Sequence, residues 1–415
     1  MVLLLNSRKI IEMHLKEPKM KNIILVLITI YILTLFVPAA AAEISEIEIK
    51  GLQKSDTSLI EKQLAFSVRE KFEEEKLILS RQRLLNSDLF NPFTLKLAGR
   101  EITQDKLKVI VEAEESGVFM IHPYEFAIRK TTGLLGEKFE QKIWNPAGNG
   151  ISYNLAFDWS DDSYQEYGLE YLADQGKIYR LSWRNFDQDL EFNQQQYLTE
   201  GNFYKFEIES LPVVNIKNTY SLKYQKNDYS TLNKDLEQEY LIPDYNFLYR
   251  GAVNFEAGLS RAFSLDDDQS DFNKITININ KGFELNNKSQ IIADFKGGYA
   301  SDETPFNYQF TAGAFSKSDG GIPIRGQEYE FAGTKYLKGT LEYQRQLWQR
   351  KIWGVLFIDT AKISASNMSL SDYDCETDAG VGIIYYSFSG PIRADLGFDN
   401  LDSDPIFNIG FGSSF

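Results

Sequence analysis

The chain has 415 residues, with 44 Lys and Arg against 59 Asp and Glu, which gives a formal net charge of −15. This acidic balance argues against nucleic acid as a partner. The single cysteine, Cys375, excludes an internal disulfide, and two histidines leave little material for a His/Cys metal site. Aromatic residues are abundant, with 23 Tyr and 29 Phe.

The first residues have the features of a secretory signal peptide. A basic start is followed by the apolar run 23–37, and Ala40 and Ala42 then form the A-x-A arrangement that precedes many cleavage sites. The apolar run is shorter than the roughly 20 residues that a membrane-spanning helix needs. We therefore expect residues 1–42 to be a cleaved signal peptide with Met20 as the natural start. The alternative is an uncleaved anchor.

Residues 43–115 predict a small α+β domain. The segment begins with the strand-like run "ISEIEIKG", and two helical patterns follow in "SDTSLIEKQLAF" and "EEEKLILSRQRLLNSDLF". The stretch "FTLKLAGREITQDKLKVIVEAEE" then has the alternation of a β-hairpin. The predicted order of elements is β-α-α-β-β.

After residue 116, apolar and polar residues alternate with the period of a strand. In "ISYNLAFDW", Ile151, Tyr153 and Leu155 share one face, while Ser152 and Asn154 share the other. Similar runs, separated by polar turns, continue to the end of the chain. They predict many antiparallel strands. A soluble sandwich or propeller would turn the apolar face of these strands inward, whereas an outer-membrane barrel would turn it outward to lipid.

Three features favour the outer-membrane barrel for residues 116–415. The signal peptide directs the chain out of the cytoplasm, the polar faces are rich in Asn, Thr, Arg and Glu, and the aromatics are numerous enough for interfacial girdles. No long apolar helix follows the signal, so a closed barrel is the remaining way to pair the backbone in lipid. At about 18 or 19 residues for each strand and its loop, these roughly 300 residues predict sixteen strands.

The last strand carries a further signal. In "PIFNIGFGSSF" the residues that share one face are Phe407, Ile409, Phe411 and Phe415. We expect them to face lipid in the strand that closes the barrel. A terminal aromatic in this position is also what the bacterial assembly machinery reads.

These features resemble the BamA/TamA superfamily of outer-membrane assembly and translocation proteins, the bacterial surface antigen family. That family joins periplasmic POTRA modules (β-α-α-β-β) to a sixteen-stranded barrel. Its lumen-loop motif is Val-Arg-Gly-aromatic, followed by a Gly-x-x-Glu strand and a Phe-x-Asp-x-Gly strand. Here the corresponding stretches are "IRGQ" from Ile324, "GTLE" ending at Glu342, and "FIDTA" around Asp359. The chain departs from the pattern at Gln327 and Ala361, and it has one POTRA-like domain where well-known members have more.

The resemblance implies that Arg325 pairs with Glu342 and Asp359 inside the barrel. Alternation along the strand after the loop points Glu342 inward, and a hairpin loop as long as 318–334 is usually functional or disordered. Gly326 lets the backbone turn tightly against the wall. The alternative is an extracellular loop with a solvated arginine.

No G-x-S-x-G, P-loop or H-E-x-x-H motif occurs, so we expect neither an enzyme nor a cofactor. The predicted function is assembly or translocation of other proteins at the bacterial outer membrane, with residues 43–115 in the periplasm. The alternatives are a dedicated secretion channel, a passive pore or transporter, and a structural or adhesive surface protein. Expected partners are outer-membrane lipid, unfolded outer-membrane or secreted client proteins, and a periplasmic or inner-membrane protein that contacts the POTRA-like domain.

Overall fold

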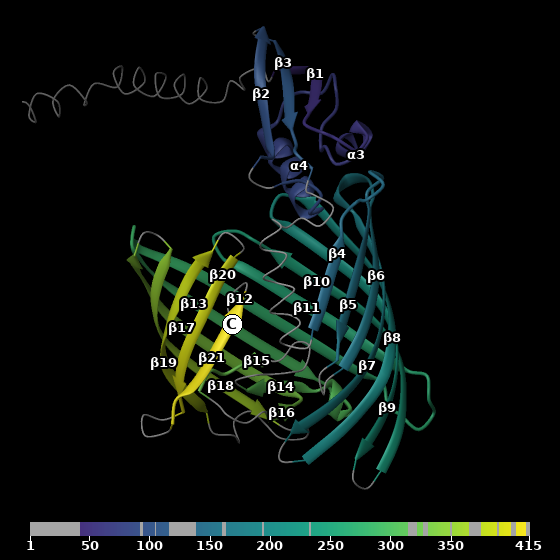
Figure 1. Cartoon of the computed structure of the whole chain (residues 1–415), viewed down its shortest axis with the longest axis vertical. Helices are drawn as coiled ribbons and strands as arrows, with labels where there is room; N and C mark the ends of the chain where they lie inside the picture. The colour runs from purple at the N-terminus through teal and green to yellow at the C-terminus, as the bar shows by residue number, and fades with distance from the viewer. Residues whose placement is uncertain are drawn as a thin grey trace, which may run out of the picture.

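A small α+β domain stands on one rim of a large curled sheet (Figure 1). The computed structural model describes residues 42–91, 94–103, 105–115, 138–159, 163–192, 195–231, 234–313, 322–326, 331–348, 351–364, 375–387, 390–399 and 404–411. Ala40, Met20 and most of the expected signal peptide lie outside these residues. Within them, none of the helices has the length and apolar character needed to cross a membrane.

The N-terminal domain has the predicted order of elements. Its elements are β1 (Glu43–Lys50), α3 (Thr57–Glu61), α4 (Glu74–Asn86), β2 (Lys96–Thr103) and β3 (Lys106–Glu112). The sheet order is β1-β3-β2, with β1 parallel and β2 antiparallel to the central strand. Helix α3 begins where the Asp56 carboxylate accepts a hydrogen bond from the Ser58 backbone N–H at 2.8 Å, and this bond satisfies one orphan donor of the first turn.

The core of this domain continues into the barrel. Ile44, Ile60 and Val109 are fully buried between its sheet and helices. Leu172 and Ile178, which flank a turn of the barrel, belong to the same buried cluster. The domain is therefore packed on the barrel rim by shared apolar burial, the main favourable contribution to such an interface.

Hydrogen bonds to barrel turns reinforce this packing. The Gln63 side-chain amide donates to the Ala173 carbonyl at 2.7 Å and accepts from the Gly176 N–H at 2.8 Å. Arg83 Nε donates to the Leu211 carbonyl at 3.2 Å. Gly176 has φ +71°, and a Cβ there would collide with the Arg83 side chain. Further side-chain bonds join Ser55 to Asn145, Gln82 to Asn215, and Asn86 to Glu209. We call this end of the barrel the near rim and the opposite end the far rim.

The barrel sheet contains fifteen strands within the described residues. They are β4 (Lys138–Ile143), β5 (Ile151–Asp158), β6 (Ser163–Leu172), β7 (Ile178–Phe192), β8 (Gln195–Val213), β9 (Ile216–Thr231), β10 (Lys234–Tyr249), β11 (Asn254–Ser264), β12 (Phe272–Asn286), β13 (Ser289–Ala300), β17 (Lys335–Trp348), β18 (Ile352–Ser364), β19 (Glu376–Ser387), β20 (Gly390–Phe398) and β21 (Ile406–Phe411). All neighbours pair in antiparallel fashion and in chain order, and β4 and β21 are the two ends of the sheet. The count is one below the sixteen expected from the sequence, and residues 116–137 lie outside the described part.

The two faces of the sheet differ as the alternation predicts. On β17, Leu337 and Leu341 are 43% and 53% exposed on the outer face, whereas Lys338 and Glu342 are 2% and 6% exposed. A soluble sandwich would bury the leucines and expose the charges. The opposite arrangement is that of a barrel with lipid outside and a polar interior.

The connection between β13 and β17 enters the barrel from the far rim. It contains the 3-10 turn η2 (Phe306–Tyr308) and the short strands β14 (Phe310–Gly313), β15 (Ile322–Pro323) and β16 (Phe331–Gly333). These strands form a small sheet of their own, which lies inside the barrel (Figure 1). Phe310, Ile322 and Ile324 pack there against Tyr336 and Ala361 of the wall. We call residues 301–334 the lumen loop.

Candidate functional site

Arg325 lies inside the barrel, in the part of the lumen loop that follows β15. Its side chain is 1% exposed, because Ile324 before it is buried in the apolar cluster that anchors the loop to the wall. Gln327, the next residue but one, lies outside the described residues. The burial of Arg325 requires partners, since an unpaired guanidinium away from water is very costly.

Two carboxylates, both expected from the sequence, contact Arg325. Its Nε and Nη2 donate to the two carboxylate oxygens of Asp359 at 2.7 and 2.8 Å, which is a bidentate fork. Its Nη1 donates to Glu342 Oε1 at 2.6 Å. The guanidinium carbon also lies 3.5 Å from the ring centroid of Phe357. The ring therefore covers one face of the guanidinium plane in a cation–π contact.

A second arginine completes the cluster. Arg393 of β20 donates from Nη2 to Glu342 Oε1 at 2.8 Å and from Nε to Asp395 Oδ2 at 2.7 Å. Asp395 is also 3.4 Å from Nη1 of Arg325. Two guanidinium groups are therefore interleaved with three carboxylates, and each carboxylate contacts at least one guanidinium. Removing any one member of the network would strand a buried charge, which is strongly destabilising.

The backbone around Arg325 is held as closely as the side chain. The Gly326 N–H donates to Asp378 Oδ2 at 2.8 Å, and the Arg325 carbonyl accepts from the Asn408 side-chain amide at 2.9 Å. A Cβ at Gly326 would stand 2.7 Å from the Asp378 carboxylate carbon and 2.8 Å from the Phe398 backbone. Glycine is required at this point because the loop approaches the wall so closely.

Each of the last five strands thus contributes a polar group to the dipeptide Arg325–Gly326. The contributors are Glu342 on β17, Asp359 on β18, Asp378 on β19, Asp395 on β20 and Asn408 on β21. Residues 129–415, which include the loop and all five strands, match the Omp85 superfamily domain. The chain belongs to the Omp85 superfamily.

Solved structures of the same superfamily share the fold at low sequence identity. BamA from Haemophilus ducreyi lacking POTRA domains 1–3 matches with a TM-score of 0.56 at 12% identity, over 89% of this chain and 84% of that one. CdiB from Acinetobacter baumannii matches with a TM-score of 0.59 at 13% identity, over 90% and 73% of the two chains. CdiB from Escherichia coli gives 0.60 at 11% identity, over 89% and 75%.

Four polar residues of this Omp85 site are not among those predicted from the sequence, and the first of them is Asp378 on β19. Arg393 and Asp395 stand two apart on β20, and Asn408 stands between the outward Phe407 and Ile409 on β21. The same alternation that pointed Glu342 inward would have found them. Their positions in the cluster around Arg325 depend on the strand register around the barrel, which a single sequence does not specify.

The C-terminal residues named from the sequence are described in part. Phe407 and Ile409 are 56% and 53% exposed on the outer face, whereas Asn408 is fully buried. Phe411 ends β21 and pairs with Ile392, but its side chain is outside the description, as is the whole of Phe415. Ala42 is the first described residue, and its carbonyl accepts from the Phe72 N–H at 2.9 Å.

The chemistry of the cluster is that of a fixed anchor. Among the described residues, no group of three or more His, Cys, Asp or Glu side chains is arranged to hold a metal ion. The carboxylates of Glu342 and Asp359 are instead directed at guanidinium groups. The arrangement can hold a loop, or release it if the ion pairs are separated.

Proposed function

We propose that this Omp85 protein assembles or translocates other proteins at the bacterial outer membrane. The observation that carries the proposal is the attachment of Arg325–Gly326 to all five of the last strands. It fixes the lumen loop and the C-terminal part of the wall as one body. The protein would act by binding polypeptide and not by catalysis.

In this proposal the client binds at the seam between the first and last strands of the barrel. Among the described residues, the last strand, β21, pairs only with β20 and is six residues long, whereas β8 has nineteen. A short, weakly paired seam can open, and an incoming client strand can add to the exposed edge by β-augmentation. The loop would keep β17–β21 in register while the seam opens.

We propose that the complete barrel has sixteen strands. The turn after β4 contacts the N-terminal domain through Asn145, so β4 runs from the far rim to the near rim. The N-terminal domain ends at the near rim. A further strand between the domain and β4 would connect the rims and give the even count typical of outer-membrane barrels.

In this arrangement the N-terminal domain is a POTRA-like module in the periplasm. Its β2 lies at the free side of the β1-β3-β2 sheet and is exposed along most of its length. An unpaired edge of this kind can template an extended segment of a client or of a periplasmic or inner-membrane partner.

A dedicated secretion channel is the second candidate. It is favoured by a cavity of 690 Å³ between charged inward side chains of β4–β12, on the part of the wall that does not hold Arg325. In that case the lumen, and not the seam, carries the client.

Depletion of the protein separates these roles. The outer-membrane and secreted proteomes would be measured as the protein is lost from cells. Parallel loss of many β-barrels identifies general assembly, and loss of one secreted protein identifies a dedicated channel. An unchanged proteome in both compartments would contradict the proposal.

A further inference from the structure

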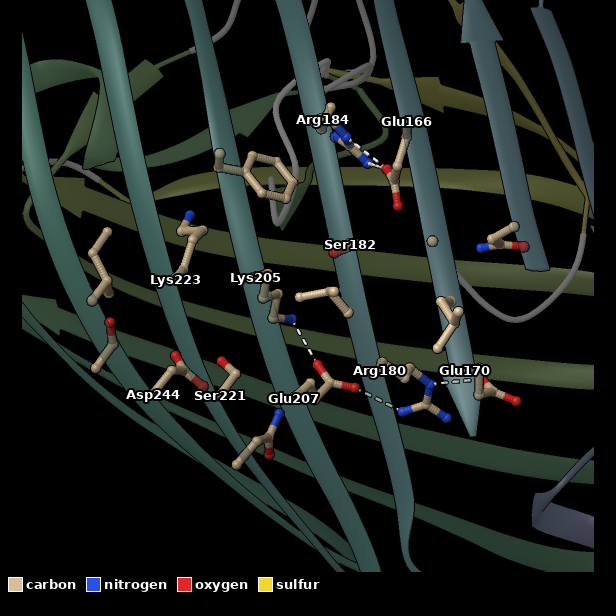
Figure 2. Close-up of a pocket in the computed structure, with 18 of the residues that line it drawn as sticks. Glu166, Glu170, Arg180, Ser182, Arg184, Lys205, Glu207, Ser221, Lys223 and Asp244 are labelled. Carbon is tan, nitrogen blue, oxygen red and sulfur yellow. Dashed lines mark hydrogen bonds and ion pairs between the residues drawn. The ribbon is translucent and has the colours of Figure 1, made fainter. Parts of the chain in front are cut away.

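The basic side chains on the two faces of the barrel wall have different surroundings. Inside the lumen, Arg180 donates to Glu170 at 2.8 Å and to Glu207 at 2.7 Å, and Arg184 pairs with Glu166 (Figure 2). On the outer face the neighbouring side chains are mostly apolar. A charged side chain on that face is costly in the bilayer core, so it must reach the polar headgroups of the lipid.

Four neighbouring strands, β12, β13, β17 and β18, have an outer face without acidic residues. They pair in this order in the barrel sheet and are described along their whole length. The outward positions of each strand are identified by one exposed apolar residue, and these are 42–55% exposed: Ile275, Phe295, Leu341 and Leu356. No Asp or Glu occurs at any position of the same parity on these strands.

Arg345 stands on this outer face, at the near-rim end of β17. It is exposed and lies four residues from the outward Leu341, so the alternation turns its side chain toward lipid. Its partners on the adjacent strands are Ser289 and Gly354, which are too small to cover the guanidinium. Among the described residues, no carboxylate pairs with Arg345.

Three lysines lie at the same end of these strands. Lys281 on β12 is outward, and its ammonium lies 4.8 Å from the ring centroid of Phe283, which is two residues closer to the near rim. The long side chain therefore extends toward the headgroups. Lys288 and Lys351 are exposed in the near-rim turns that join β12 to β13 and β17 to β18. The Lys288 carbonyl accepts from the Gln346 N–H at 2.8 Å, so its turn adjoins β17.

An apolar and aromatic band borders these cations. Its residues are 45–62% exposed at the near-rim ends of β12 and β17, and they are Phe283, Leu285, Leu347 and Trp348. Tryptophan favours the level of the lipid headgroups. Glu284, the acidic residue closest to Lys281 in the chain, lies at a lumen-facing position in register with Gln290. The outer face therefore combines apolar contact area with basic groups at its edge.

We propose that Arg345, Lys281, Lys288 and Lys351, which we call the headgroup site, bind the phosphate groups of anionic phospholipids. A guanidinium can donate two parallel N–H bonds to one phosphate, and lysines beside it add positive charge. The acyl chains of the same lipids cover the apolar band, which a free phosphate ion would leave in contact with water. The chain has a net charge of −15, so attraction to an anionic lipid requires a local site of this kind.

The headgroup site goes beyond the proposed function, because it requires only that the barrel lies in a bilayer. It shares a strand with the anchor inside the lumen. Arg345 and Glu342 are three residues apart on opposite faces of β17, and Glu342 accepts from Arg325 at 2.6 Å. Lipid outside and the lumen loop inside therefore hold the same strand, away from the last strand of the sheet.

Lipid retention by the purified full-length protein tests the headgroup site. The protein would be released from nanodiscs that contain equal amounts of phosphatidylglycerol and phosphatidylcholine with the same acyl chains. Native mass spectrometry then counts the lipids of each kind that stay bound. We expect phosphatidylglycerol to be retained in preference to phosphatidylcholine, and its retention to fall as salt rises. Inorganic phosphate should displace it no better than chloride does at the same ionic strength.

Arg345→Gln should lower the retention of phosphatidylglycerol by about fivefold and leave that of phosphatidylcholine unchanged. Gel mobility before and after heating checks that the barrel is folded. Lys362→Gln is the matched control, because Lys362 is an outward residue of β18 near the far rim, in register with Leu337. It removes one positive charge from the same outer face, and its retention of both lipids should equal that of the unmodified protein.

Equal retention of the two lipids by the unmodified protein, or unchanged retention by Arg345→Gln, would overturn the headgroup site. An equal loss in Arg345→Gln and Lys362→Gln would also overturn it, because the effect would then follow total charge and not position. Stronger displacement by phosphate than by chloride would assign the cations to a free anion and contradict the lipid. The proposed function is judged separately, by depletion in cells, and an unchanged proteome there would leave the lipid measurement as it is.

Discussion

The Asn408 side chain donates a hydrogen bond to the backbone carbonyl of Arg325 at 2.9 Å, which attaches the lumen loop to the last strand of the sheet. Asn408 is fully buried, and its neighbours Phe407 and Ile409 point outward. One residue of β21 therefore connects the interior anchor with the strand that borders the seam. In the proposed mechanism, release of the loop and loosening of the seam would be coupled through this contact.

Asn408→Leu should loosen β21 without changing its outer face. The substitution leaves the buried Arg325 carbonyl without this donor, at a cost of about 1–3 kcal/mol. We expect faster amide hydrogen exchange in residues 406–411 of the folded protein. Ile409→Leu on the opposite face of the strand is the control and should exchange as the unmodified protein does. Equal exchange in Asn408→Leu would show that the contact does not hold the strand.

Arg325→Ala should leave a barrel that inserts but is less stable and has a loose loop. Removing one partner of a buried ion pair typically costs about 3–5 kcal/mol, because the remaining charge is stranded. Arg325→Lys should rescue poorly, because an ammonium cannot form the planar fork to Asp359 while reaching Glu342.

Thermal unfolding in detergent and conductance in planar bilayers measure both effects of the Arg325 variants. The unmodified protein should give small currents, and the Ala and Lys variants should give larger, flickering ones with a lower midpoint of unfolding. A Lys variant that matches the unmodified protein in both measurements would argue against a geometric role for the guanidinium.

Gly326→Ala should displace the loop although it adds only one methyl group. The new Cβ would lie within 3 Å of the Asp378 carboxylate and of the Phe398 backbone, so the loop tip or the wall must move. Gly282→Ala is the matched control, because a Cβ there meets no atom within 4 Å. We expect increased protease cleavage in the lumen loop for Gly326→Ala alone. Resistance equal to that of the control would contradict the close approach.

Cleavage of the expected signal peptide after Ala42 is tested by N-terminal sequencing of protein from the outer membrane. The mature chain should begin at or near Glu43, the first residue of β1. An intact N-terminus would remove the reason for placing residues 43–115 in the periplasm.

The sequence predicts the barrel well because strand alternation is a local property. Leu337, Lys338, Leu341 and Glu342 occupy the faces that a period of two assigns to them. The contacts of Arg325 with Glu342 and Asp359 were expected from the resemblance to the family motif, and these partners lie 17 and 34 residues from Arg325 in the chain. Neither prediction depends on which strands pair with each other around the barrel.

Other features depend on the register between strands or on surfaces that meet in space. Asn408 is 83 residues from Arg325 in the chain, and a shift of one residue in β21 would turn it outward. The strands inside the lumen loop are two to four residues long, too short to show a period. The N-terminal domain docks through hydrogen bonds that Gln63 and Arg83 donate to backbone carbonyls of the barrel. Every residue has a backbone carbonyl, so the barrel sequence gives no sign of where these bonds form.

The central claim is that Arg325 is held inside the barrel by the wall, and a thiol crosslink tests it without removing any charge. Ile324→Cys and Ala361→Cys would be combined in a Cys375→Ser background, since both positions belong to the buried cluster beside Arg325. In whole cells a short bifunctional thiol reagent should join the two, and an impermeant maleimide should fail to label Ile324→Cys. The native Cys375, which is exposed, serves as the positive control for labelling. Strong labelling of Ile324→Cys from outside, with no crosslink to position 361, would place the loop in solvent and contradict the account.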